Sequence, residues 1–205
     1  MIEAKSRPQP LPLLPTLSRR QGLQALAAAG LAGWGLRVQA QPGPAAVDLE
    51  RGLAGHWRGV LQYRDYQSDR LLDLPMRSQI QVGPDQVTIT RLSTFDDGPV
   101  TGWVYITTTS LFDAPAAGKV SSAMFRKGRA VETWTEDTRV QQHLDAEHWT
   151  VVSLQMGQDN RQPAVIRTTQ TRDGATLSTR KEVKPPDAPD SAYVLRNQTR
   201  LTREP

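Results

Sequence analysis

The densest group of potential metal ligands lies in residues 143–148, which read His143-Leu144-Asp145-Ala146-Glu147-His148. A protein metal site needs such side chains to converge on one point. Two histidines five residues apart on a β-strand project from opposite faces, because side chains alternate along a strand. The segment therefore predicts a solvated loop, and we expect no metal ligands here.

Nucleophilic chemistry has one candidate, the Ser-x-x-Lys pattern formed by Ser178 and Lys181. That pattern occurs in penicillin-recognising enzymes, where both side chains lie on one face of a helix. On a strand, a spacing of three places them on opposite faces, so we treat the match as chance. The sequence has no cysteine and therefore no thiolate nucleophile. No nucleophile elbow, phosphate loop or dinucleotide motif is present. We assign no catalytic residue.

Charge is unevenly distributed along the 205 residues, whose formal net charge is +4. The excess of basic residues lies in residues 1–40, and residues 41–205 carry equal numbers of basic and acidic side chains. A body without net charge creates no field that would collect phosphate groups. This distribution argues against nucleic acid or an anionic membrane as a partner.

Residues 1–40 have the character of a targeting segment. The run Ser18-Arg19-Arg20-Gln21-Gly22-Leu23 resembles the twin-arginine export motif of bacteria, and an Ala/Leu/Gly-rich stretch follows it. The resemblance implies contact with the twin-arginine export machinery, cleavage after Ala40 and a periplasmic or secreted protein that is not inserted in a membrane. A general secretory signal and an uncleaved anchor are the alternatives.

Beyond the leader, apolar side chains recur with the period of two that is typical of β-strands. Trp57, Gly59, Leu61 and Tyr63 form one such series, and 103–111 form another. Lys127-Gly128 and Asp173-Gly174 are hairpin turn signals. We expect nine or ten strands in one domain, residues 53–205, after a linker with a short helical turn at 41–52.

Consecutive hairpins leave two free sheet edges, and closing the sheet into a barrel removes them. The predicted fold is therefore an all-β, single antiparallel up-and-down barrel. A two-sheet β-sandwich is the alternative, but it requires longer crossing connections, for which only 112–118, 139–148 and 184–191 are available.

The segment Gly55-His56-Trp57, placed after a short turn, resembles the start of the first strand in the calycin superfamily, which includes lipocalins and fatty-acid-binding proteins. The resemblance implies that Trp57 closes one end of a barrel and packs near an Arg of the last strand. Arg196, Arg200 and Arg203 are the candidates, and we favour Arg200. Related haem-binding barrels use a late histidine, whereas the last histidine here is His148, so we expect no cofactor.

If the face with Trp57 points inward, aromatic and polar side chains of other strands join it in the lumen. We expect ligand contacts from these five: Tyr63, Trp103, Tyr105, Trp149 and Asn197. Such a lumen suits a small, partly apolar or amphipathic ligand. The alternatives are a filled barrel that serves as a protein-interaction module in the periplasm, and a barrel enzyme, an isomerase or a hydrolase, with its site in the cavity.

Overall fold

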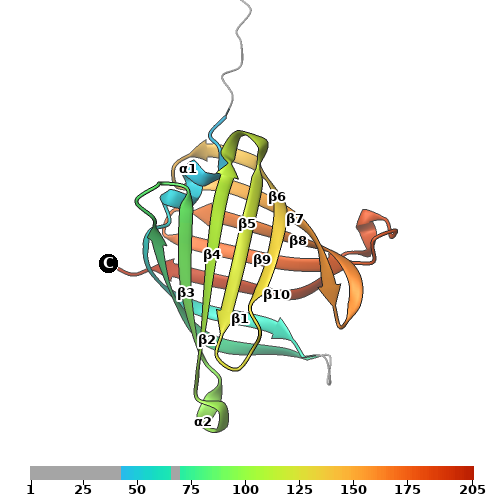
Figure 1. Ribbon diagram of the computed structural model, residues 1–205. Coiled ribbons are helices and arrows are strands. Elements are labelled where there is room, and N and C mark those ends of the chain that lie inside the picture. Colours follow the sequence, from blue (N-terminus) through green and yellow to red (C-terminus); the bar gives the residue numbers. More distant parts are fainter. Residues whose placement is uncertain (1–42, 66–69) are drawn as a thin grey trace, which may run out of the picture. The chain divides into compact units, whose positions relative to one another are not determined.

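The computed structural model describes residues 43–65 and 70–205, and in this part of the chain ten strands form one closed antiparallel barrel (Figure 1). Each strand pairs with its neighbour in sequence, and β1 pairs with β10 to close the ring. The predicted up-and-down barrel is confirmed, and the sandwich alternative is wrong. The leader, 1–40, lies outside the described residues.

The strands and short helices follow one another with few irregular connections. Their bounds are α1 Ala46–Arg51, β1 Gly55–Arg64, β2 Leu71–Val82, β3 Thr88–Asp96, α2 Gly98–Thr101, β4 Trp103–Ala114, η1 Pro115–Ala117, β5 Lys119–Arg126, β6 Glu132–Asp145, β7 His148–Asp159, β8 Gln162–Asp173, β9 Thr176–Lys184, η2 Asp190–Ala192 and β10 Val194–Arg203. No helix among the described residues is long and apolar enough to cross a bilayer.

Hairpin connections follow from the turn chemistry of the sequence. Between β8 and β9, Gly174 adopts a φ of 58°, a left-handed conformation that glycine reaches without steric cost. Such a turn matches the twist of the flanking strands, so Thr176 pairs directly with Asp173. This hairpin fixes which residues of β8 and β9 share the inner face.

The hydrophobic core lies at the end of the barrel that α1 covers (Figure 1). Trp57 and Trp149 are fully enclosed there, with exposed fractions of 0% and 2%. Leu49 and Leu53 from the α1 segment pack into the same cluster. This cluster closes that end of the barrel, and Ala164, Ile166 and Val183 form a second, smaller buried cluster.

Candidate ligand-binding site in the barrel lumen

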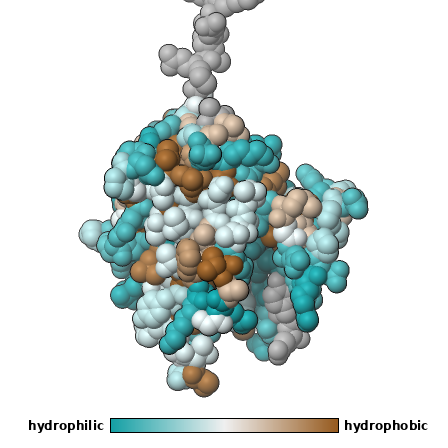
Figure 2. Space-filling view, viewed as in Figure 1, coloured by the Kyte–Doolittle hydropathy of each residue, from teal (hydrophilic) through white to brown (hydrophobic). Residues whose placement is uncertain are grey.

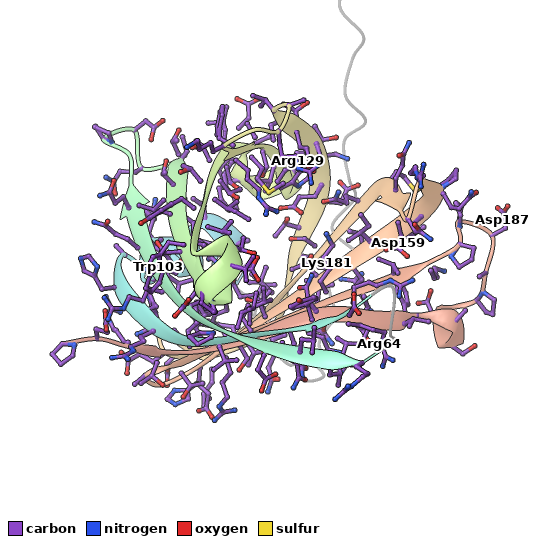
Figure 3. The ribbon with its side chains drawn as sticks, turned by 90° about the horizontal axis from the view of Figure 1, so that it is seen from below. Arg64, Trp103, Arg129, Asp159, Lys181 and Asp187 are labelled. Carbon is purple, nitrogen blue, oxygen red and sulfur yellow. The ribbon has the colours of Figure 1, made fainter. Side chains whose placement is uncertain are left out.

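Two cavities lie on the inner side of the strands. The first, which we name the polar chamber, has a volume of about 260 Å³ and is lined by Glu50, Arg91, Trp134, Glu136, Thr179 and Lys181 among others. The second, the apolar chamber, has about 240 Å³ and is lined by Leu61, Leu74, Phe95, Val104 and Ile106, with Tyr63, Asp97 and Arg126. Figure 3 looks into the ring of strands and shows Lys181 on β9.

The chambers adjoin along β4, whose inward residues alternate with outward ones. Thr108 lines the polar chamber, and Ile106, the next inward residue, lines the apolar chamber. Residues two apart on a strand are separated by about 7 Å along its axis. The lumen therefore changes from polar to apolar over a distance shorter than a small organic molecule.

Glu50 enters the polar chamber from α1 and is held by two side chains of the barrel wall. Its carboxylate lies 3.6 Å from the guanidinium of Arg91 and accepts a hydrogen bond from the amide of Gln170. Arg91 also donates to the Gln170 oxygen at 3.3 Å. Burial raises the pKa of Glu50, although Arg91 and Gln170 oppose the rise. These contacts tie the helix to β3 and β8.

Glu136 faces the same chamber from β6. Burial raises the pKa of its carboxyl to about 7, and the nearby Glu50 carboxylate adds to the rise, whereas Trp134 and Lys181 lower it. A carboxyl group with this pKa exchanges its proton near neutral pH. The polar chamber therefore changes its charge in the physiological range.

The raised pKa of Glu136 predicts a pH-dependent stability. The folded protein holds a proton that the unfolded chain releases above about pH 4.5, so wild-type stability falls as the pH rises from there to about 7. The full shift corresponds to about 3 kcal/mol, which partial solvent access reduces to about 2 kcal/mol. Glu136→Gln should therefore raise the free energy of unfolding by about 2 kcal/mol at about pH 8 and change it little near pH 5.

Denaturant unfolding of both proteins at the two pH values measures this difference. Glu132→Gln, an exposed position on the same strand, is the matched control. An equal effect of Glu136→Gln on the free energy of unfolding at both pH values would contradict the raised pKa of Glu136.

Two buried polar atoms of the polar chamber lack hydrogen-bond partners of good geometry among the described residues: Nε1 of Trp134 and Oγ1 of Thr179. Other hydroxyls there are paired, with 2.8 Å between Ser110 and Ser122 and 2.7 Å between Thr138 and Ser153. Because buried polar groups are almost always satisfied, the unpaired Oγ1 of Thr179 beside a cavity favours a partner from outside the chain, whereas Nε1 of Trp134 still interacts with the Glu136 carboxylate.

The closed end differs from the sequence prediction in one residue. Arg203, not Arg200, lies over the Trp57 ring, at 5.4 Å from its centroid, and donates to the carbonyl oxygens of Gly52 and Ala54. Trp57 and Arg203 are directly paired across β1 and β10, so both point inward, whereas Arg200 pairs with Val60 and points outward. We correct the choice of Arg200 accordingly.

The five residues expected to contact a ligand lie in different parts of the barrel. Tyr63 lines the apolar chamber, and Asn197 is paired with it across β1 and β10, on the same inner face. Trp149 points inward but is buried in the core at the closed end, where its Nε1 donates to the carbonyl of Ala146 at 3.2 Å. It lines neither chamber.

Trp103 and Tyr105 are on the outer face, with exposed fractions of 55% and 58%. The inner face of β4 is formed by the alternate residues, Val104 and Ile106 among them. The expectation that Trp103 and Tyr105 line the lumen is corrected. Their strand has apolar residues on both faces, so alternation alone did not identify the inner one.

The segment at 143–148 forms the ends of β6 and β7 and the tight turn between them. Nδ1 of His148 lies 2.8 Å from Asp145, and within the described part of the chain no group of three or more His, Asp or Glu side chains could hold a metal ion. At the opposite end of the barrel, Arg196 makes an ion pair with Asp159.

Together, the fold and the two chambers define a closed ten-stranded antiparallel β-barrel with a lumenal cavity. No protein-family model matches the sequence. No curated protein matches it either. Among solved structures, the fold of this chain is similar to the crystal structure of Rv2717c from M. tuberculosis, with a TM-score of 0.54 and 15% sequence identity. The match covers 80% of this chain and 100% of that chain. At this identity the similarity concerns the fold alone.

Proposed function

We propose that the protein is an exported β-barrel that binds a small, partly apolar organic molecule in its lumen. The observation that carries this proposal is the pair of adjoining chambers of contrasting polarity. Each chamber alone is smaller than the about 300 Å³ at which ligand pockets usually begin. A ligand of ordinary size therefore occupies both, with polar atoms near Trp134 and Lys181 and its apolar part near Ile106.

Export is supported by the leader, whose resemblance to twin-arginine signals implies a periplasmic or secreted protein. The twin-arginine route carries folded proteins, so a ligand could be taken up before or after export. Binding in the lumen does not depend on which of the two occurs.

Native mass spectrometry of the protein, purified from an expressing bacterium without denaturation, tests the binding proposal. We expect a mass above that of the polypeptide, by the mass of one small molecule, which is lost on acid denaturation. Leu61→Trp fills the apolar chamber and should reduce the bound fraction at least about tenfold, because overpacked cavities exclude guests. A polypeptide mass without adduct, unchanged after incubation with bacterial small-molecule extract, would refute the proposal.

The outer face of β4 and β5 supports the second candidate, a protein-interaction module. Trp103, Tyr105 and Phe125 are exposed there among uncharged residues such as Thr107 and Ala123. Figure 2 shows this pale and brown region over β4 and β5, with hydrophilic side chains around it. Exposed apolar patches on soluble proteins often mark binding surfaces. A species with the mass of two chains in the same spectra would favour this function.

Catalysis is the third candidate. Glu50 and Glu136 both have raised pKa values and line one cavity, which is the pattern of groups that transfer protons in active sites. Recovery of a lumenal ligand in an altered chemical form, dependent on Glu136, would favour an isomerase or a hydrolase over a binding protein.

A further inference from the structure

We infer that the polar chamber binds the carboxylate group of a small organic monoanion through Trp134, Thr179 and Lys181. This inference rests on the proposed lumenal binding and names the chemical class of the ligand. Three hydrogen-bond donors, the charges that face one another in the chamber, and the apolar chamber beside it support this inference.

The three donors lie on the inner face of two strands. Trp134 belongs to β6, whereas Thr179 and Lys181 are successive inward residues of β9. Nε1 of Trp134 can only donate, and Oγ1 of Thr179 can donate or accept. Both atoms are buried and form no hydrogen bond of good geometry in the described chain, although the Trp134 side chain does interact with the Glu136 carboxylate and lowers its pKa. Both side chains can donate to an oxygen atom of a ligand in the chamber.

Lys181 supplies a positive charge to the same acceptor. Its ammonium group makes no side-chain hydrogen bond or ion pair with the described residues, although it attracts the Glu136 carboxylate across the chamber. An ammonium group carries three donor hydrogens. Trp134, Thr179 and Lys181 all line the polar chamber and thus offer several donors and one positive charge to a ligand there.

The charge balance of the chamber selects a monoanion. The charged side chains that line it are Glu50 from α1, Arg91 from β3, Glu136 from β6 and Lys181 from β9. Glu50 and Arg91 form an ion pair, so their charges offset each other. When Glu136 is protonated, Lys181 remains as one uncompensated cation. One such cation balances a carboxylate, whereas a phosphate ester would leave excess negative charge in a confined space.

Ligand binding and protonation of Glu136 are therefore coupled. A bound carboxylate repels the ionised form of Glu136, whose pKa of about 7 lies close to neutral pH. Binding should take up a proton from solution at neutral pH, and the affinity for a carboxylate should fall as the pH rises through that value.

The apolar chamber determines the rest of the molecule. Phe95, Val104 and Ile106 offer an aliphatic and aromatic surface next to Thr108. The two chambers hold about 260 and about 240 Å³, so the organic body is compact, of the size of an aromatic ring with a short chain.

Isothermal titration calorimetry with three matched probes tests the inference: 4-phenylbutanoate, 4-phenylbutanamide and 4-phenylbutan-1-ol. At about pH 6 the carboxylate should bind at least about tenfold more tightly than the amide and the alcohol, and this preference should shrink at about pH 8. Titrations in two buffers of different ionisation enthalpy should show proton uptake, which Glu136→Gln abolishes.

Substitutions distinguish the loss of a hydrogen-bond donor from a general effect on the fold. Lys181→Met and Trp134→Phe should each weaken carboxylate binding about tenfold and leave amide binding within about twofold. Lys119→Met, an exposed lysine on the outer side of β5, is the control and should change neither. Thermal unfolding of each variant establishes that the barrel is intact.

The outcomes are distinct. Equal affinity for all three probes would overturn the carboxylate site and leave lumenal binding in place. Carboxylate binding that Lys181→Met and Trp134→Phe do not weaken would also overturn it. Failure of all three probes to bind, at both pH values, would count against the carboxylate site and the lumenal binding proposal together.

Discussion

Trp57→Ala is expected to lower the free energy of unfolding by about 3–5 kcal/mol, the range found when large buried aromatic side chains are removed. The indole is completely enclosed, its Nε1 donates to the carbonyl of Leu53 at 2.8 Å, and Arg203 covers its ring. The substitution opens a cavity between α1 and the first strand and leaves that carbonyl without its donor. Chemical denaturation, followed by far-ultraviolet circular dichroism, measures the change.

Trp103→Ala is the matched control, because this tryptophan is 55% exposed on the outer face. It should change stability by less than about 0.5 kcal/mol, as is usual for surface positions. A loss below about 1 kcal/mol for Trp57→Ala would show that its ring does not hold the closed end of the barrel.

Gly59→Ala should destabilise the protein by about 3 kcal/mol, the upper part of the range for overpacked sites. A Cβ atom added to Gly59 would lie 2.0 Å from the carbonyl oxygen of Arg200 on the neighbouring strand. Because the obstacle is backbone rather than a flexible side chain, β1 and β10 have to move apart. The substitution therefore acts on the one strand pair that closes the ring.

Gly43→Ala is the control for this substitution, since no atom lies within 4 Å of the added Cβ there. It should leave the denaturation midpoint unchanged. If Gly59→Ala had an equally small effect, β1 and β10 would not be as closely packed as described. Loss of near-ultraviolet dichroism with retained strand signal would indicate an opened barrel.

The barrel could be predicted because its signals are local. Strands such as Gly55–Arg64 show a period of two, and turn residues such as Asp173-Gly174 mark hairpins between neighbours. Sequential hairpins leave few topologies, and closure is the one that removes both edges. The position of Trp57 at the closed end was predicted from the resemblance that Gly55-His56-Trp57 carries, not from the period of the strand.

The lumen was harder to predict because strand alternation gives two faces without saying which is inner. On β4 the outward series contains Trp103 and Tyr105, and the inward series contains Val104 and Ile106. Both series are apolar enough to form a core. Their assignment depends on the register with β3, which places Trp103 opposite Asp96 and is fixed by contacts that no short sequence window contains.

The partner of Trp57 was ambiguous for the same reason. Arg200 and Arg203 lie three residues apart on one strand and thus face opposite sides. Only the pairing of Trp57 with Arg203 across β1 and β10 decides between them.

The polar chamber was missed because its charged residues resemble solvated ones. Glu50, Arg91, Glu136 and Lys181 are distributed over four elements and form no motif. One signal was present on β6, where Trp134, Glu136 and Thr138 share a face. Because the tryptophan and the glutamate lie on the same face of the strand, either the tryptophan is on the outer surface or the glutamate is inside the barrel. In the structure both side chains face the lumen.

Closure of the ring between β1 and β10 also affects how the chain folds. Every other strand pair forms between neighbours in sequence, but the residues that join Trp57 to Arg203 include nearly the whole domain. Such long-range pairing comes late and slows folding, because the entropy of a large loop is lost before the contact forms. Until β10 has left the ribosome and docked, β1 and β9 each expose an unpaired edge that can associate with other nascent chains.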